Sequence, residues 1–160
     1  MRCFTLASCV VLLAAPNLQA QATPAAKPAA LKWGPPPPAF PKGARMAVVS
    51  GDPSQAQPFE LEFSMPSGYR VAPHFHPTDE TVTVKRGTFV VGMGDKFDLK
   101  QAKALKKGEQ ETMPAQQHHF AMARGKTLID VKATGPFAIT YVNPADDPQQ
   151  HHAKKKKAAA

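Results

Sequence analysis

The chain has 160 residues and a formal net charge of +8, but that charge is concentrated at the two ends. Without Arg2 and the run Lys154–Lys157, fifteen basic and twelve acidic residues remain, so the rest carries only +3 and lacks the balance typical of nucleic-acid-binding proteins. Both cysteines, Cys3 and Cys9, lie near the N-terminus, which excludes a disulfide-held fold, and the length suits one domain.

Residues 1–22 have the features of an export signal. Arg2 precedes an apolar run at residues 10–15, and small residues at Ala20 and Ala22 offer two cleavage positions. The apolar run is far shorter than the roughly 20 residues that a membrane span requires. We therefore expect cleavage, no membrane span, and a periplasmic or secreted protein. A lipid-anchored form would use Cys9, but that cysteine precedes the apolar run.

Residues 23–44 form a leader rich in proline and alanine, including the run Pro35–Pro38. A polyproline segment donates no backbone hydrogen bonds and stays extended, so it acts as a spacer or as a strap along a surface. Trp33 and Phe40 flank the run and could pin such a strap against the domain. A partly ordered leader is the alternative interpretation.

Residues 45–146 have the pattern of an all-β domain. Apolar and polar residues alternate from Phe59 to Met65, which predicts a strand with one buried face. Glycines punctuate further short apolar runs, and strands at this spacing favour a sandwich or barrel. The other predicted strands cover residues 46–50, 80–85, 88–93, 110–113, 120–123, 127–133 and 137–142.

Two segments depart from this strand pattern. Residues 98–105 (DLKQAKAL) begin with an acidic residue and contain good helix formers, which predicts a short inserted surface helix with its lysines in solvent. Residues 147–160 contain His151, His152 and four lysines without an apolar pattern, so we expect a disordered tail.

The strongest chemical signal is a group of three possible metal ligands. His74, His76 and Glu80 are separated by even numbers of residues, so a strand would present all three on one face. Imidazoles and a carboxylate inside a barrel would be costly without a partner. A divalent metal ion is the economical partner for this set, and iron, manganese, zinc, nickel, cobalt and copper all suit it.

These residues resemble the first motif of the cupin superfamily. The motif reads Gly, five residues, His-x-His, three or four residues, Glu, six residues, Gly. This sequence fits it at every position, with Gly68, His74, His76, Glu80 and Gly87.

A second cupin motif is partly matched downstream. It reads Gly, five residues, Pro-x-Gly, two residues, His, three residues, Asn. Gly108, Pro114 and His119 fit, whereas Gln116 replaces the second glycine and Ala123 the asparagine.

The resemblance covers roughly residues 46–143 and implies an antiparallel jelly-roll β-barrel. It also implies one divalent metal ion held by His74, His76, Glu80 and His119, with Glu80 either a ligand or a catalytic base. The motif register selects His119 over His118, which strand alternation then turns outward. A homodimer is a further expectation from the resemblance.

The wall of a ligand pocket is harder to predict. Three polar side chains, Tyr69, Arg70 and Gln116, are candidates near the mouth, and an otherwise apolar cavity favours a small, largely uncharged ligand. Larger apolar side chains are candidates for the wall, although most such residues simply form the core. The apolar candidates are Phe63, Met65, Phe75, Met93, Met113, Phe120 and Tyr141.

Two functions suit these predictions. The first is a metal-dependent enzyme, an oxygenase, lyase or isomerase, that acts on a small organic molecule, with Glu80 moving a proton. The second is a module that binds a small molecule or metal without turning it over. This function stays open because a complete set of metal-ligating residues does not by itself prove catalysis.

Overall fold

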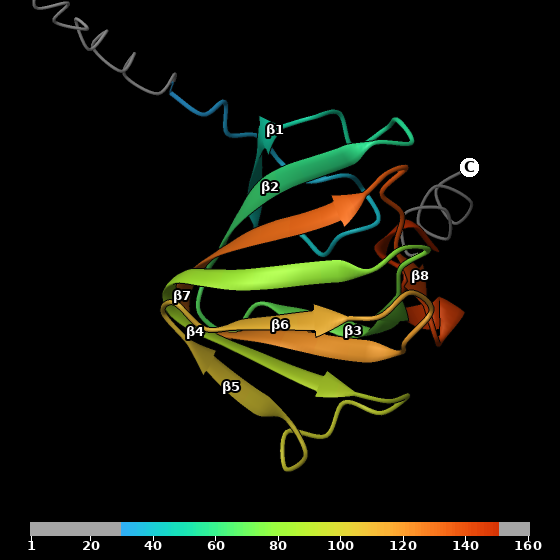
Figure 1. Ribbon diagram of the computed structural model, residues 1–160. Helices are drawn as coiled ribbons and strands as arrows, with labels where there is room; N and C mark the ends of the chain where they lie inside the picture. Colours follow the sequence, from blue (N-terminus) through green and yellow to red (C-terminus); the bar gives the residue numbers. More distant parts are fainter. Residues whose placement is uncertain (1–29, 151–160) are drawn as a thin grey trace, which may run out of the picture.

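The computed structural model describes residues 30–150, which form an antiparallel β-structure (Figure 1). The predicted signal peptide and the residues of the tail from 151 onward lie outside the described residues, so these stay predictions. Within residues 30–150, no helix has the length and hydropathy that a membrane crossing needs. The elements are β1 (Arg45–Ser50), β2 (Pro58–Met65), β3 (Arg70–Phe75), β4 (Glu80–Met93), β5 (Lys103–Lys106), β6 (Gln110–Met113), β7 (His119–Thr134), β8 (Thr140–Tyr141) and a 3-10 helix, η1 (Pro144–Asp146).

Two long strands, β4 and β7, build both layers of the fold. The first half of β4 pairs with the second half of β7, and the remaining halves pair with each other. In the first layer, β2 and then β1 extend the sheet beyond β7, while β6 pairs with β4. In the second layer, β3 and β8 lie beyond β7, while β5 pairs with β4. Figure 1 shows β4 and β7 running through the middle of the molecule between β1 and β5.

Both long strands change layer at a glycine in the left-handed region. Gly87 has φ +82° and Gly125 has φ +77°, a conformation that other residues adopt only with strain. The pairing of β4 with β7 is irregular between Val84 and Thr88. As a result, even-numbered residues of β4 face the interior before the bend and odd-numbered residues face it after the bend. Val82 and Val84 therefore face the interior before the bend, and Phe89 and Val91 face it afterwards.

The hydrophobic core lies between the two layers. Alternation along β2 buries Phe59, Leu61, Phe63 and Met65, as the sequence predicts. Strands predicted separately on either side of Gly87 and Gly125 are single bent strands, and the run at 137–142 forms only the two-residue β8.

The helix predicted over residues 98–105 is wrong. Asp98 instead accepts a hydrogen bond from the backbone N–H of Lys100 at 2.9 Å, and the following residues form β5. Leu105 is fully buried opposite Phe89 of β4. Burial of one apolar side chain and pairing with β4 outweigh the helix propensity of this segment. The short helical element lies at η1 instead.

The end of the predicted leader lies against the domain as a strap, defined here as residues 34–44. Gly34 and Met46 exchange two backbone hydrogen bonds at the edge of β1, with N···O distances of 2.8 and 2.9 Å. Further along, Phe40 packs against Phe63 with ring centroids 5.3 Å apart. Phe40 thus anchors the strap to the core.

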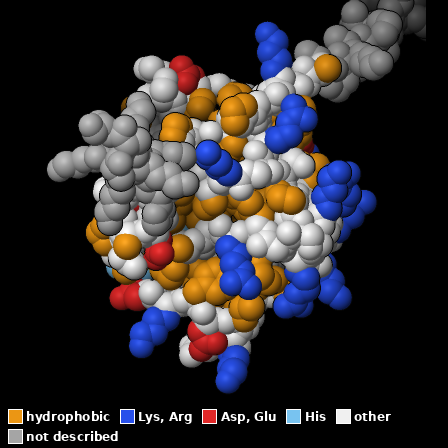
Figure 2. All heavy atoms as spheres, turned by 180° about the vertical axis from the view of Figure 1, so that it is seen from behind, with side chains coloured by type: hydrophobic (Ala, Val, Ile, Leu, Met, Phe, Trp, Pro, Cys, Tyr) orange, Lys and Arg blue, Asp and Glu red, His pale blue; other side chains and the backbone are white. Residues whose placement is uncertain are grey.

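Charged side chains are dispersed over the outside of the fold. On the face shown in Figure 2, hydrophobic side chains occupy the middle, and Lys and Arg side chains lie mainly around them. Several basic residues are also paired with acids, including Lys85 with Glu62 at 3.1 Å and Lys132 with Glu60 at 3.7 Å. The low net charge inferred from the sequence is consistent with this distribution.

Gly87→Ala should destabilise the fold more than Gly125→Ala. Both substitutions place alanine at a positive φ, which costs about 1–2 kcal/mol. A Cβ at Gly87 would also lie 2.6 Å from the carbonyl oxygen of Lys126, whereas a Cβ at Gly125 meets no atom within 4 Å. We expect losses of about 3 and about 1 kcal/mol in the free energy of unfolding, measured by urea denaturation. Equal losses would contradict this account of the bend.

Candidate metal centre

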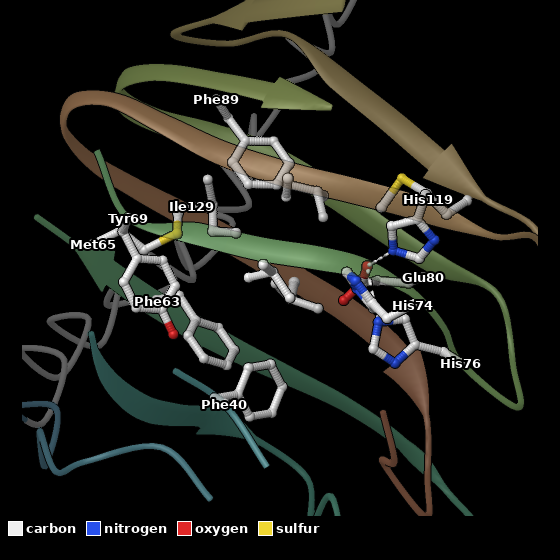
Figure 3. A pocket seen from close by; sticks show the side chains of 15 residues that line it. Phe40, Phe63, Met65, Tyr69, His74, His76, Glu80, Phe89, His119 and Ile129 are labelled. Atoms are coloured by element: carbon white, nitrogen blue, oxygen red, sulfur yellow. Dashed lines mark ion pairs between the residues drawn. The ribbon is translucent and has the colours of Figure 1, made fainter. Parts of the chain in front are cut away.

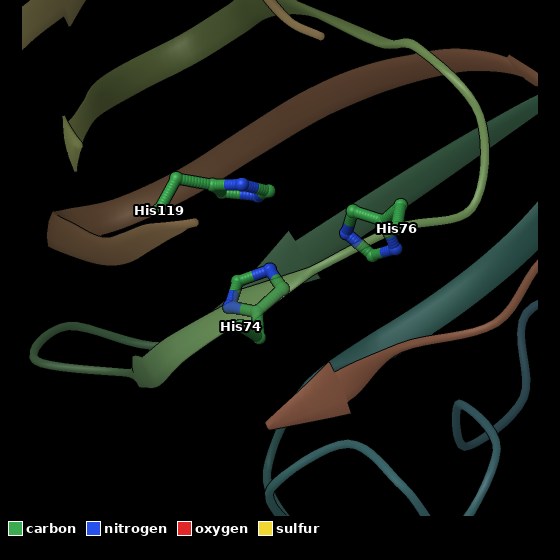
Figure 4. A group of neighbouring side chains, drawn as sticks. All are labelled: His74, His76 and His119. Carbon is green, nitrogen blue, oxygen red and sulfur yellow. The ribbon is translucent and has the colours of Figure 1, made fainter. Parts of the chain in front are cut away.

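Three histidine side chains from two separate parts of the chain converge between the two layers of the fold (Figure 4). His74 lies on β3, His76 comes directly after the last residue of that strand, and His119 is the first residue of β7. One ring nitrogen from each lies within 4.8 Å of the others. The closest ring centroids, those of His74 and His119, are 4.2 Å apart, and each side chain is at most 4% exposed.

Strand pairing explains why residues 45 positions apart meet. His74 stands directly opposite His119 in the antiparallel pairing of β3 with β7. Side chains at directly opposed positions lie close together on the same face of a sheet. His119 therefore occupies the inward position that the motif register predicts.

Glu80 completes the cluster from a different strand. It is the first residue of β4, and its Oε2 atom lies 3.6 Å from Nε2 of both His76 and His119, as the dashed lines in Figure 3 mark. The prediction that His74, His76 and Glu80 lie on one strand is wrong. β3 ends at Phe75, and a connection returns the chain to the cluster at Glu80.

Each imidazole is held by a backbone carbonyl at its Nδ1 atom. The acceptors are the carbonyl oxygens of Ala72 for His74 at 2.7 Å, Ala138 for His76 at 2.6 Å, and Gln117 for His119 at 2.9 Å. A carbonyl oxygen only accepts, so each Nδ1 carries the proton. In the neutral rings, every Nε2 is then left with a free lone pair, which is the arrangement of metal-ligating histidines.

The residues present fit a divalent metal ion. Nε2 of His119 is buried and has no hydrogen-bond partner, which is costly unless something else satisfies it. Two ligand atoms on one ion, each about 2.1 Å from it, lie at most about 4.2 Å apart. The separations of 3.6 Å between Glu80 and two of the imidazoles satisfy this condition.

Electrostatics favour the unprotonated forms of His74 and Glu80. Burial, together with His119 and His76, lowers the pKa of His74 to about 3. Burial alone would raise the pKa of Glu80, but the three neighbouring histidines together outweigh it, so the pKa lies below its usual value. An ionised carboxylate and neutral imidazoles are the forms that bind a metal ion.

The cluster lies at one end of an internal cavity whose other walls are apolar (Figure 3). The centres of water molecules can occupy a volume of about 40 Å³ inside the cavity. That volume holds about three waters. Figure 3 shows the histidines and Glu80 at one end and Phe40, Phe63, Met65 and Tyr69 away from them. The remaining wall residues are Val71, Val82, Phe89, Met113, Ala121, Ile129 and Val131.

Among the predicted pocket residues, Tyr69, Phe63, Met65 and Met113 line the cavity. Alternation along β2 carried a signal for Phe63 and Met65. Phe89 and Ile129 also line the cavity but were not predicted as wall residues, because their positions depend on how β4 and β7 bend. Phe40 was recognised only as an anchor of the strap.

Other predicted pocket residues lie outside the cavity. Phe120 is buried on the outer face of the second layer, where its ring lies 4.6 Å from that of Phe97. Arg70 lies over the ring of Phe97, with its guanidinium carbon 5.2 Å from the ring centroid. The segment after β4 folds over this face and creates a second small apolar contact there.

Three further predicted pocket residues also lie outside this cavity. Met93 is 42% exposed, and Gln116 is an exposed turn residue with φ +62°. Tyr141 is buried and its ring centroid lies 6.1 Å from that of His74, yet it does not border the cavity. Phe75, another apolar candidate for the wall, is also outside it.

His118 points away from the cluster, as alternation predicts. Its Nδ1 lies 2.6 Å from Oδ1 of Asp95, and its ring stacks on Phe75 with centroids 5.1 Å apart. The adjacent histidines therefore have different surroundings, one half-exposed and paired with an acid, the other fully buried.

Comparisons with known proteins identify the fold. No protein-family model and no curated protein matches the chain. Similar solved structures include a candidate acetylacetone dioxygenase from Methylibium petroleiphilum PM1, at TM-score 0.58 and 20% identity, covering 74% of this chain and 79% of that one. The polyketide cyclase RemF from Streptomyces resistomycificus has TM-score 0.56 and 17% identity, covering 70% and 80%.

A cupin superfamily protein from Desulfitobacterium hafniense DCB-2 is also similar, with TM-score 0.50 and 15% identity over 58% of this chain and 78% of that one. At these identities the similarity establishes the fold and not the activity. The chain has the jelly-roll fold of the cupin superfamily, which confirms the resemblance inferred from the motifs.

Acid should destabilise the metal-free protein through His74. Its pKa is about 3 in the folded state against 6.5 for the free side chain. Between these values the unfolded state binds more protons, so the free energy of unfolding falls as the pH drops below about 6.5. Urea denaturation with a chelator at about pH 7.5 and pH 5 measures this fall.

His74→Gln should make this decrease smaller. His118→Gln, at the half-exposed neighbouring histidine, should retain the wild-type difference between the two pH values. The account would be wrong if the two variants lost stability equally on acidification.

Proposed function

We propose that the protein binds one divalent metal ion through His74, His76 and His119, with Glu80 beside them, and acts on a small organic molecule. The reaction would be of the oxygenase, lyase or isomerase type. The observation that carries the proposal is the set of three Nδ1 hydrogen bonds to carbonyl oxygens, which leave three Nε2 lone pairs in a buried pocket. Iron, manganese, zinc, nickel, cobalt and copper all suit this donor set.

The proposed chemistry follows from the cavity. A bound divalent cation would supply a Lewis acid for the oxygen atoms of a chelating ligand. The apolar walls would exclude water and accommodate the carbon skeleton of the ligand. Ionised Glu80, 3.6 Å from two of the imidazoles, would accept a proton from the ligand.

The acid and base groups that line the cavity limit the type of reaction that can take place there. Glu80 is the one carboxylate among the described residues that line the cavity. Tyr69 donates its hydroxyl hydrogen to the carbonyl oxygen of Pro41 at 2.7 Å, and burial raises its pKa. A single proton acceptor suits reactions that begin with enolate formation, in which one C–H proton is removed.

Similar folds support an enzyme without specifying the reaction. The candidate acetylacetone dioxygenase and the polyketide cyclase are both named as enzymes. A binding module without turnover would use the same cavity. Oxygen uptake and product analysis with a panel of diketones, using protein loaded with each metal, would separate the two functions.

His76→Ala should abolish stoichiometric metal binding. The substitution removes one of three imidazole ligands, so affinity should fall by more than the 10–100-fold expected for the loss of an outer partner of a ligand. Calorimetric titration of untagged protein with Zn²⁺ and elemental analysis would measure this loss. Equal occupancy in the variant and the wild type would contradict the proposal.

His118→Ala is the matched control, because it removes an imidazole next to the cluster in sequence but outside it in space. Its metal occupancy should equal that of the wild type. Loss of metal in both variants would contradict the choice of His119 as the ligand.

A further inference from the structure

Phe40 separates the internal cavity from a second space on the surface. Among the described residues, it alone lines both the cavity and an outer depression of about 480 Å³. That depression is lined by the strap itself and Pro148. Removal of the Phe40 ring would therefore connect the cavity to the surface.

Two buried tyrosines hold the backbone on both sides of Phe40. The hydroxyl of Tyr141 donates to the carbonyl oxygen of Ala39 at 2.8 Å, and that of Tyr69 donates to the carbonyl oxygen of Pro41 at 2.7 Å. Both tyrosines are 7% exposed, and both belong to the domain rather than the strap. These contacts fix the position of the residue between the two carbonyls.

Aromatic contacts hold the ring itself. Phe40 lies 5.3 Å from Phe63 and 6.0 Å from Phe137, measured between ring centroids. Phe137 in turn stacks on His76 at 5.1 Å with an interplanar angle of 15°. The ring that closes the cavity is thus packed, through one other ring, against a histidine of the cluster.

We propose that Phe40 sets the length of the ligand. A ligand would place its chelating oxygens at the histidines and extend its apolar part along the cavity until it meets Phe40. The matching substrate class is a compact oxygen chelator carrying a short apolar group. The chelating end rests on the proposed function, whereas closure of the cavity by Phe40 does not require a metal.

A homologous series of alkyl hydroxamates tests this proposal, because each member chelates through the same two oxygens. Calorimetry would measure the binding of hydroxamates with two to ten carbons to Zn²⁺-loaded protein. In the wild type, affinity should stop rising after the first few members. In Phe40→Ala it should continue to rise by about fourfold per methylene, the factor that corresponds to burial of one CH₂ group.

A metal-free comparison distinguishes failure of this proposal from failure of the metal centre. With a chelator present, NMR titration should detect n-butylbenzene binding to Phe40→Ala at least tenfold more tightly than to the wild type. Absence of hydroxamate binding in every metal-loaded form would contradict the metal centre. The butylbenzene comparison would still test whether Phe40 closes the cavity.

Phe97→Ala is the matched control, because it removes a half-buried phenylalanine that packs on another ring but does not line the cavity. Its chain-length profile should match the wild type. Identical profiles in the wild type and Phe40→Ala would overturn the proposal.

Tyr141→Phe keeps the test decisive if Phe40→Ala does not fold. It removes only the hydroxyl that holds the carbonyl of Ala39 and should improve binding of the longest hydroxamates and of butylbenzene by twofold or more. No improvement for either probe would count against the proposal.

Discussion

The structure depends on how three imidazoles and a carboxylate are accommodated in an apolar interior. Buried polar groups are tolerated only when their hydrogen-bonding capacity is used. Here the backbone satisfies one side of each ring, because three carbonyl oxygens accept from the Nδ1 atoms of His74, His76 and His119. The other side of each ring faces its neighbours and Glu80. The same hydrogen bonds that make burial tolerable therefore also orient the lone pairs toward a common point.

This constraint explains the role of the bent strands. β4 and β7 each contribute to both layers, and each supplies one group of the cluster at an end, Glu80 on β4 and His119 on β7. A flat pairing of these strands would leave no enclosed space between the layers. The bends at Gly87 and Gly125 place one half of each strand over the other half, so the polar cluster and the apolar wall lie in one cavity.

The strap adds a second level of organisation, since its contacts extend to the same cluster. Tyr141 contacts the strap through its hydroxyl and stands directly opposite His74 in the pairing of β8 with β3. Phe137 packs between Phe40 and His76. The Pro-rich segment is thus part of the cavity wall, and its proline content limits the conformations that the backbone around Phe40 can adopt.

Local sequence patterns were enough to predict β2 as a strand with one buried face, to recognise the two histidine-containing motifs and to select His119. Each of these depends on residues only a few positions apart. Tertiary structure decided the features that require distant contacts. Leu105 became part of a strand because β4 offers a partner. His76 donates a hydrogen bond to the carbonyl oxygen of Ala138, 62 residues away. The backbone next to Phe40 is held by the hydrogen bond from the Tyr141 hydroxyl to the carbonyl oxygen of Ala39, which spans 102 residues. Periodicity carries no information about such pairs, since it reports which face a residue lies on and not what that face meets.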